Sequence, residues 1–195
     1  MNMRIVAAVC ISLVGTVSTE QTVNPMAIAH GTVGQLQHAL NTTARVWKYQ
    51  TTDVNETQEC EYLQIKPSNQ TEYNLTRTYQ DSGQLVQKSY HANVSSENSD
   101  VQGAKLTVFS AEGPARDFLL LAWNEDGKCG VFSNGPMGAV KSTSDICELY
   151  VWDQNVTNVP NSTCEEYYQT YCKYYPNYTE PRILYQDKCQ LEQGC

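Results

Sequence analysis

The sequence predicts a mainly β fold, an eight-stranded antiparallel up-and-down barrel with a short helix before the strands and a longer helix after them. Eight short segments of alternating or continuous apolar residues follow one another, each bounded by polar or turn-forming residues. The tripeptide Asp81-Ser82-Gly83 separates two of these segments and is typical of a β-hairpin turn. A closed barrel of this kind can hold one small ligand in its interior.

The expected elements follow in a simple order. A helix that Thr32 can cap runs to Leu40 and places Leu36 on its apolar face. Residues 92–104 are polar and are expected to form a loop, and a turn is expected at Glu112-Gly113-Pro114. The eight expected strands are Ala44–Thr52, Glu59–Lys66, Tyr73–Gln80, Gln84–His91, Lys105–Ser110, Arg116–Trp123, Cys129–Ser133 and Ile146–Asp153.

The stretch 147–172 joins the last strand to the final helix. Its strand alternates, so Glu148, Tyr150 and Trp152 share one face of the sheet. The helix begins after residues 162–163, a serine and a threonine that suit the N-cap position, and it carries two glutamates in its first turn.

The first 18 residues have the composition of a secretory signal peptide. Arg4 supplies the positive charge, and the apolar run Ile5–Val17 follows it. A buried helix is the alternative interpretation of this run, which is too short for a membrane anchor. We expect residues 1–18 to be a signal peptide, residues 19–195 to form a single domain, and the protein to be secreted into the extracellular space.

The chain is acidic, with 13 Lys and Arg, 21 Asp and Glu, and a net charge of −8. Removing residues 1–18 takes away the charge of Arg4 and leaves −9. This charge disfavours nucleic acids and anionic membranes as partners. No later segment approaches the roughly 18 apolar residues that a membrane span needs, so no membrane anchor is expected.

N-x-S/T sequons occur eight times, which is a strong sign of N-glycosylation in a chain with a signal peptide. A glycan cannot be packed in a core, so the sequons that are used mark the outer surface. The asparagines are Asn41, Asn55, Asn69, Asn74, Asn93, Asn155, Asn161 and Asn177.

Motifs of catalysis, metal binding and cofactor binding are not found in the sequence. It contains no GxSxG elbow, no HExxH, no phosphate loop and no Cys/His group with metal spacing. His30, His38 and His91 are scattered along the chain and are better explained as solvated or locally bonded residues than as a catalytic base. We therefore expect neither an enzyme, nor a metal site, nor a cofactor.

Three motifs of the sequence resemble those of the tick salivary lipocalins, the family that includes the histamine-binding proteins. They are DGKCGV at 126–131, ELYVWD at 148–153 and N-V-P-x-x-x-C at 158–164. The order of elements over residues 30–195 also fits, and the sterol-binding, immunomodulatory Japanin-like branch is one alternative within the family. The resemblance implies a lipocalin barrel with its C-terminal helix packed outside.

The amine-binding members of that family resemble C-D-[VIL], then E-L-W after a gap, then a further Cys. This chain has Gly130 in place of the aspartate and Tyr150 in place of the tryptophan. A buried ammonium needs carboxylates around it. We therefore expect the ligand to be a sterol such as cholesterol, or a fatty-acid-derived lipid, in preference to histamine or serotonin.

Eight cysteines are present, and Cys10 falls in the expected signal peptide, so seven remain for an oxidising compartment. The sequence alone allows many pairings. The resemblance implies two main disulfides, Cys60–Cys189 and Cys129–Cys164. We expect Cys147–Cys195 as a third pair, which leaves Cys172 over, either buried as a small hydrophobe or linking two chains.

Glu148 is the expected polar group of the pocket, because it shares a strand face with two aromatic rings. The alternative is that this face meets solvent. Apolar residues of other strands are expected to line the barrel, although core packing alone would explain each of them. The expected ligand-binding residues are Glu148, Tyr150, Trp152, Trp47, Tyr49, Phe109, Phe118 and Leu120.

The function implied by the resemblance is sequestration of a small host mediator or lipid, which would modulate host immunity and inflammation. One alternative is a scavenger of biogenic amines. Another is a protein that uses the barrel as a scaffold and binds a host immune protein on its outer surface.

Overall fold

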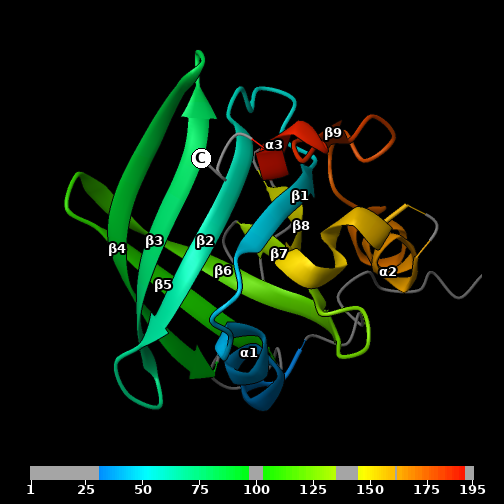
Figure 1. Ribbon diagram of the computed structural model, residues 1–195. Helices are drawn as coiled ribbons and strands as arrows, with labels where there is room; N and C mark the ends of the chain where they lie inside the picture. Colours follow the sequence, from blue (N-terminus) through cyan, green and yellow to red (C-terminus); the bar gives the residue numbers. More distant parts are fainter. Residues whose placement is uncertain (1–30, 97–102, 135–144, 161, 192–195) are drawn as a thin grey trace, which may run out of the picture.

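The computed structural model describes residues 31–96, 103–134, 145–160 and 162–191. The expected signal peptide lies outside these ranges. The described chain forms a closed antiparallel barrel with one helix at its end and another at its side (Figure 1), as the sequence predicts.

Eight strands close the barrel in chain order, because β1 pairs with both β8 and β2. A two-residue strand near the C-terminus, β9, pairs with the other end of β1. The strands are β1 (Val46–Thr51), β2 (Glu59–Pro67), β3 (Glu72–Asp81), β4 (Gln84–Ser96), β5 (Ala104–Ser110), β6 (Gly113–Asn124), β7 (Cys129–Asn134), β8 (Ile146–Trp152) and β9 (Arg182–Ile183).

Helix α1 (Val33–Leu40) covers one end of the barrel and contacts β4, β5 and β6. The Thr32 hydroxyl accepts a hydrogen bond from the backbone N–H of Gln35 at 3.2 Å, which confirms the expected N-cap. Gly31 precedes the cap, and a Cβ at this position would lie 2.5 Å from the Leu120 side chain. Glycine is therefore required for the helix to approach the barrel this closely.

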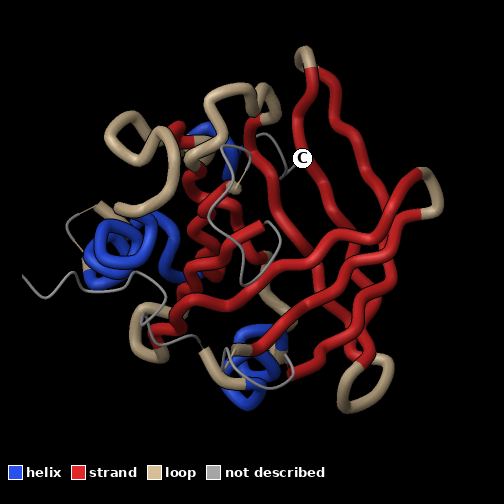
Figure 2. The backbone as a smooth tube through the Cα atoms, turned by 180° about the vertical axis from the view of Figure 1, so that it is seen from behind, coloured by secondary structure: helices blue, strands red, loops and turns tan. Residues whose placement is uncertain are grey.

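Helix α2 (Thr163–Cys172) lies outside the barrel against β6, β7 and β8, after the short 3₁₀ helix η2 (Asp153–Asn158). Ser162 caps it, since its hydroxyl accepts a hydrogen bond from the backbone N–H of Cys164 at 3.2 Å. Seen from behind in Figure 2, α1 and α2 both lie outside the strands. None of the helices in the described part of the chain has the length and apolar content that a membrane crossing requires.

Two apolar cores lie on the two sides of the barrel wall. The inner core contains Leu75 and Leu106 together with residues of α1. The outer core lies between the wall and α2 and contains Leu149, Val151 and Tyr168. Strands β1 and β8 are therefore buried on both faces, whereas β4 has one face in solvent.

The expected loop at 92–104 is partly wrong. Strand β4 continues to Ser96, and β5 begins at Ala104. Ala92 and Val94 are 0% and 3% exposed because they point into the barrel, and the residues between and after them are polar. The residues of this segment that point into the barrel are small, and those that point outward are polar, so the segment has the composition of a loop. Strand β6 likewise begins within the expected turn, at residue 113.

Two disulfides have the partners that the resemblance implies. Cys60 at the start of β2 is bonded to Cys189 of the short helix α3 (Lys188–Leu191). Cys129 at the start of β7 is bonded to Cys164 in the first turn of α2. The C-terminal segment and the beginning of α2 are thus covalently tied to the barrel.

The third expected pair is wrong. Cys147 of β8 is bonded to Cys172, the last residue of α2, and not to Cys195, which lies outside the described residues. Cys172 is therefore neither unpaired nor a link between chains. The helix runs along the outer wall, so both of its ends reach cysteines on outward faces of neighbouring strands.

Six of the sequon asparagines are exposed, Asn155 is half-buried, and Asn161 lies outside the described residues. Their exposure is compatible with glycosylation, which stays a prediction. The six exposed asparagines are Asn41, Asn55, Asn69, Asn74, Asn93 and Asn177.

Replacing Cys147 and Cys172 together by alanine should lower the free energy of unfolding by about 3–4 kcal/mol, the chain-entropy estimate for a loop of this length. Urea unfolding of the oxidised protein measures this change. Peptide mapping without reduction should recover the two cysteines in one linked pair of peptides. Recovery of Cys147 linked to Cys195 would contradict the position of α2.

Candidate functional site

The barrel encloses a cavity of about 390 Å³, within the range of small-molecule sites. Ala39 and Leu40 of α1 line it at one end. Asp53 of the β1–β2 connection and Glu112 of the β5–β6 turn line it at the other end. Helix α1 therefore forms the floor, and the connections opposite it surround the mouth.

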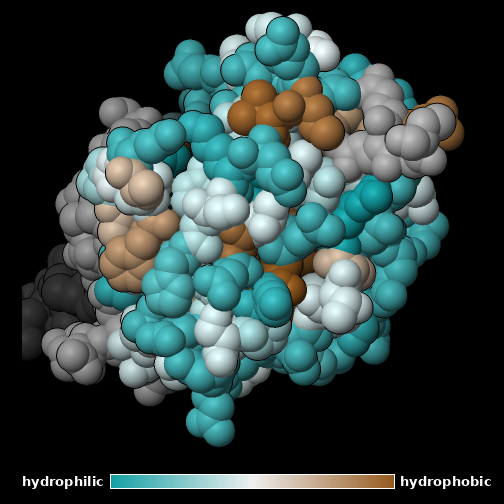
Figure 3. Space-filling view, turned by 60° about the vertical axis from the view of Figure 1, so that its left-hand side comes forward, coloured by the Kyte–Doolittle hydropathy of each residue, from teal (hydrophilic) through white to brown (hydrophobic). Residues whose placement is uncertain are grey.

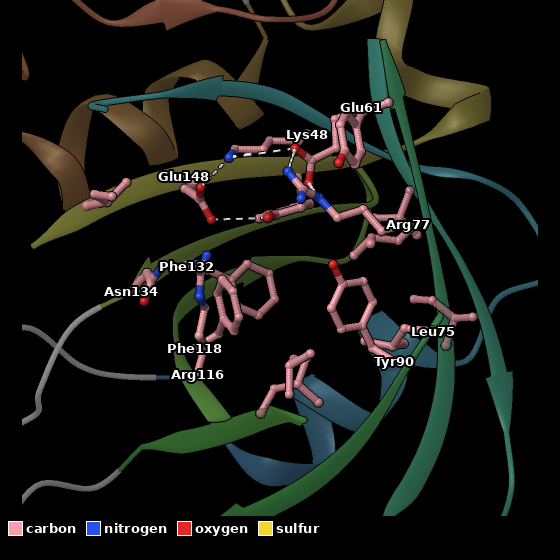
Figure 4. Close-up of a pocket in the computed structure, with 18 of the residues that line it drawn as sticks. Lys48, Glu61, Leu75, Arg77, Tyr90, Arg116, Phe118, Phe132, Asn134 and Glu148 are labelled. Atoms are coloured by element: carbon pink, nitrogen blue, oxygen red, sulfur yellow. Dashed lines mark hydrogen bonds and ion pairs between the residues drawn. The ribbon is translucent and has the colours of Figure 1, made fainter. Parts of the chain in front are cut away.

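The greater part of the cavity wall is apolar. Inward side chains of all eight barrel strands contribute to the wall, which is the result of the two-residue period of each strand. Figure 4 shows Leu75, Phe118 and Phe132 around the open space. This wall can contact an apolar ligand on several sides. Its members include Leu63, Ile65, Leu75, Leu106, Val108 and Phe118.

One side of the cavity carries a buried group of charged residues. The Lys48 ammonium lies 2.6 Å from the Glu148 carboxylate, 3.1 Å from that of Glu56 and 3.9 Å from that of Glu61. The Tyr150 hydroxyl donates to the second carboxylate oxygen of Glu148 at 3.0 Å. These contacts come from β1, β2, β8 and the β1–β2 connection, so only closure of the barrel brings them together.

Arg77 of β3 completes this group. Its guanidinium donates to both carboxylate oxygens of Glu61, at 2.7 and 2.6 Å, and it also contacts the side-chain oxygen of Gln58. Such a two-point contact fixes both partners in orientation. We call Lys48, Glu56, Glu61, Arg77 and Glu148 the cavity charge cluster.

The protonation states follow from burial and from these contacts. Burial by itself would lower the pKa of Lys48, but the three neighbouring carboxylates outweigh it and hold that pKa above its usual value. Burial disfavours ionised Glu56, yet Lys48 keeps the pKa of this carboxyl below its usual value. Burial and then Glu148 raise the pKa of Tyr150 well above the ordinary value. At neutral pH, Lys48 is charged and Tyr150 is a neutral hydroxyl.

Four of the expected ligand-binding residues line the cavity: Glu148, Tyr150, Trp152 and Phe118. The first three lie on the inner face of β8, and the alternative that this face meets solvent is excluded by their burial. The same alternation places Leu149 on the outer side of the wall. Contact of the four residues with a ligand stays a prediction.

The other four expected residues do not line the cavity. Trp47 and Tyr49 lie on the outer face of β1, since the inner face belongs to Val46 and Lys48. The wrong face was predicted because apolar residues occupy both sides of this strand.

Phe109 and Leu120 miss the cavity for different reasons. Phe109 is 44% exposed on the outer face of β5, whereas its neighbour Val108 points inward. Leu120 points inward but lies under Gly31 near the floor, where it is fully buried by packing. Phe118, two residues earlier on β6, reaches the open space.

Most of the cavity charge cluster was not predicted. Lys48 stands between Trp47 and Tyr49, and a lysine inside an apolar strand is a signal of a buried and paired charge. Glu56, Glu61 and Arg77, the other members of the cluster that were not predicted, carry no such signal. Within the described ranges, no group of His, Cys, Asp or Glu side chains is arranged to hold a metal ion.

No protein-family model and no curated protein matches the chain. Among solved structures, the AM182 serotonin complex is similar, with a TM-score of 0.55 and 19% sequence identity. The match covers 79% of this chain and 91% of that chain. At this identity the likeness concerns the fold alone. This likeness, together with the closed barrel and its inner cavity, shows that the chain has a lipocalin-like barrel fold. The interior of such a barrel can hold a small ligand.

Arg77→Met should lower the free energy of unfolding by about 3–5 kcal/mol, because it leaves the buried Glu61 carboxylate without its main partner. Adding Glu61→Leu removes that charge and should restore most of the loss. Urea unfolding measures both changes. Lys105→Met is the control, since it breaks a more exposed ion pair with Asp117, at 3.6 Å, and should change stability much less. A double variant no more stable than Arg77→Met would contradict this account.

Proposed function

We propose that the protein is a secreted binding protein that sequesters a small, mainly apolar molecule with one hydroxyl end. A sterol such as cholesterol or a fatty-acid-derived lipid has this character. Three disulfides support a secreted protein. Affinity would come from burial of the ligand in a preformed cavity, and no catalytic step is required.

The observation that carries this proposal is that the carboxylates of the cavity charge cluster already have cationic partners. Glu148 and Glu56 are paired with Lys48, and Glu61 is paired with Arg77. A cationic ligand would therefore have to displace a side chain of the protein. A neutral ligand leaves these pairs intact and contacts the larger apolar part of the wall.

Tyr150 and Glu148 provide a suitable site for a ligand hydroxyl. The Tyr150 oxygen donates its proton to Glu148, so its lone pairs are available to accept a hydrogen bond. Phe132 packs edge-on against the Tyr150 ring, with 5.5 Å between ring centroids. A ligand hydroxyl directed at this tyrosine would thus have its apolar body beside aromatic rings.

Gly130 supports a neutral ligand as well. It lines the cavity, and a Cβ at this position would lie 2.8 Å from the Phe132 ring and 3.4 Å from the Trp123 ring. Phe132 therefore occupies space that a side chain at position 130 would need. An aspartate there, as in the amine-binding pattern, would require that ring to move.

The resemblance of the hairpin at 126–131 and the strand at 148–153 to tick salivary lipocalins supports a role outside the producing organism. In such a role the protein would remove a host lipid mediator and so modulate immunity and inflammation.

A biogenic amine is the second candidate ligand. The cavity charge cluster contains three carboxylates and two cations, so it carries one excess negative charge. The similar AM182 structure is a complex with serotonin. These two observations make histamine and serotonin the ligands to compare with cholesterol.

A host immune protein is a further candidate partner. No sequon falls between Asn93 and Asn155, so the outer faces of β5 and β6 would be free of N-glycans. The face seen in Figure 3 is mostly hydrophilic, and its hydrophobic residues form separate patches. Of the large hydrophobic residues that are exposed in the described part of the chain, only Phe109 lies on β5 or β6. A large apolar interface on the outer faces of these two strands is therefore disfavoured, and the cavity is the stronger proposal.

Phe118→Ala should weaken binding of cholesterol or of the preferred fatty acid about 10-fold or more, because a buried phenylalanine contributes about 1.5–3 kcal/mol. Calorimetry on delipidated protein measures this. Phe109→Ala is the matched control, because Phe109 lies on the outer face of a neighbouring strand and should leave binding unchanged. Equal weakening by both variants would contradict binding inside the barrel.

Histamine and serotonin belong in the same titrations. The proposal requires the unmodified protein to bind a sterol or lipid more tightly than either amine. Submicromolar histamine binding that Glu148→Gln abolishes, with no sterol or lipid binding, would overturn it.

A further inference from the structure

The surroundings of the Lys48 ammonium resemble a binding site for a primary amine. Its side chain is 6% exposed, and its nitrogen is within 4 Å of three carboxylates. An ammonium surrounded by carboxylates on the wall of an apolar cavity is the arrangement that a buried amine ligand would need. Here the amine belongs to the protein itself.

Lys48 holds this position through the backbone pairing of β1 and β8. In that register Lys48 lies opposite Tyr150, and Thr51 lies opposite Glu148. The lysine side chain therefore reaches along its own strand toward the mouth to contact Glu148 (Figure 4). A group attached to the wall competes at a high effective concentration with any free amine that enters.

We propose that Lys48 is a specificity-determining residue, whose tethered ammonium fills an amine subsite formed by Glu148, Glu56 and Glu61 and so excludes free cationic amines from the cavity. This inference rests on the proposed function, because it concerns the selection of ligands by the same cavity. The inference adds to the proposed function that the cavity contains a subsite for a cation, which the side chain of Lys48 itself fills.

Arg77 does not take over the role of Lys48 when the lysine is removed. Its guanidinium is engaged by both oxygens of Glu61. Without Lys48, the Tyr150 hydroxyl would be the one partner that Glu148 keeps among the described residues, and Glu56 would lose its ion pair. The cavity charge cluster would then contain three carboxylates and one cation, and it would bind an external ammonium to restore the lost pairs.

Lys48→Ala tests this directly, because the atoms it removes correspond to n-propylamine. The variant should bind n-propylammonium in calorimetry, and its melting temperature should rise with the concentration of this ion. Histamine or serotonin should bind the variant at least about 10-fold more tightly than the unmodified protein, since the tethered competitor is gone. n-Propanol, which has no charge, should have no such effect.

Three variants control the interpretation. Lys48→Ala with Glu148→Gln removes the main acceptor and should lose the gain in amine binding. Lys48→Arg keeps a cation and should still exclude amines. Lys105→Ala is a matched lysine variant outside the cavity, paired with Asp117 on the barrel surface, and should gain no amine binding.

If Lys48→Ala does not fold by itself, refolding in n-propylammonium chloride should recover folded protein, and refolding in sodium chloride should not. A variant that folds but binds neither n-propylammonium nor histamine nor serotonin would overturn the inference, as would recovery equal in the two salts. Sterol and lipid titrations of the unmodified protein are read separately. Their failure would contradict the proposed function and leave the amine subsite standing.

Discussion

All six residues of β1 are buried, because the barrel interior lies on one side of the strand and the C-terminal segment lies on the other. On the outer side, the Trp47 ring packs against Tyr62 and Tyr185, with centroid distances of 5.0 and 5.2 Å. On the inner side, Lys48 lines the cavity wall and its side chain is only 6% exposed. Burial of an unpaired ammonium is too costly to be tolerated, so carboxylates from other strands must converge on it.

The C-terminal segment makes this double burial possible. Strand β1 pairs with β2 only at Val46 and Trp47, and its far end pairs instead with β9 at Gln50 and Thr51. The segment after β9 also receives a backbone hydrogen bond from Cys60 of β2. The segment therefore fills the gap where β1 and β2 separate near the mouth, and the Cys60 disulfide holds it there.

The cavity charge cluster is better explained by ligand selection than by stability. Replacing a buried set of ion pairs by apolar residues of similar volume is often neutral or stabilising, because desolvation offsets much of the attraction. An apolar barrel interior would thus fold without these charges. Under the proposed function, their arrangement around one side of a cavity, with Lys48 at its centre, would instead determine which polar groups of a ligand are accepted.

Much of the fold was predictable because the barrel consists of consecutive antiparallel strands joined by short connections. Local alternation and turns such as Asp81-Ser82-Gly83 then determine most of the topology; Ser82 and Gly83 both have positive φ, as a tight hairpin turn requires. Prediction failed at Ala92 and Val94, because the polar residues around them obscured the alternation of the strand. It also failed for the partner of Cys147, because the local sequence does not distinguish Cys172 from Cys195 as that partner.

The sequence by itself determined which residues of each strand share a face, because this depends only on the two-residue period of the backbone. On β8 that was sufficient to place Glu148 and Tyr150 together. Only the tertiary structure decided which face of β1 points inward, because Trp47 and Lys48 lie on opposite faces of a strand that is buried on both. It also decided the partners of Lys48, since they lie on segments that meet only when the barrel closes.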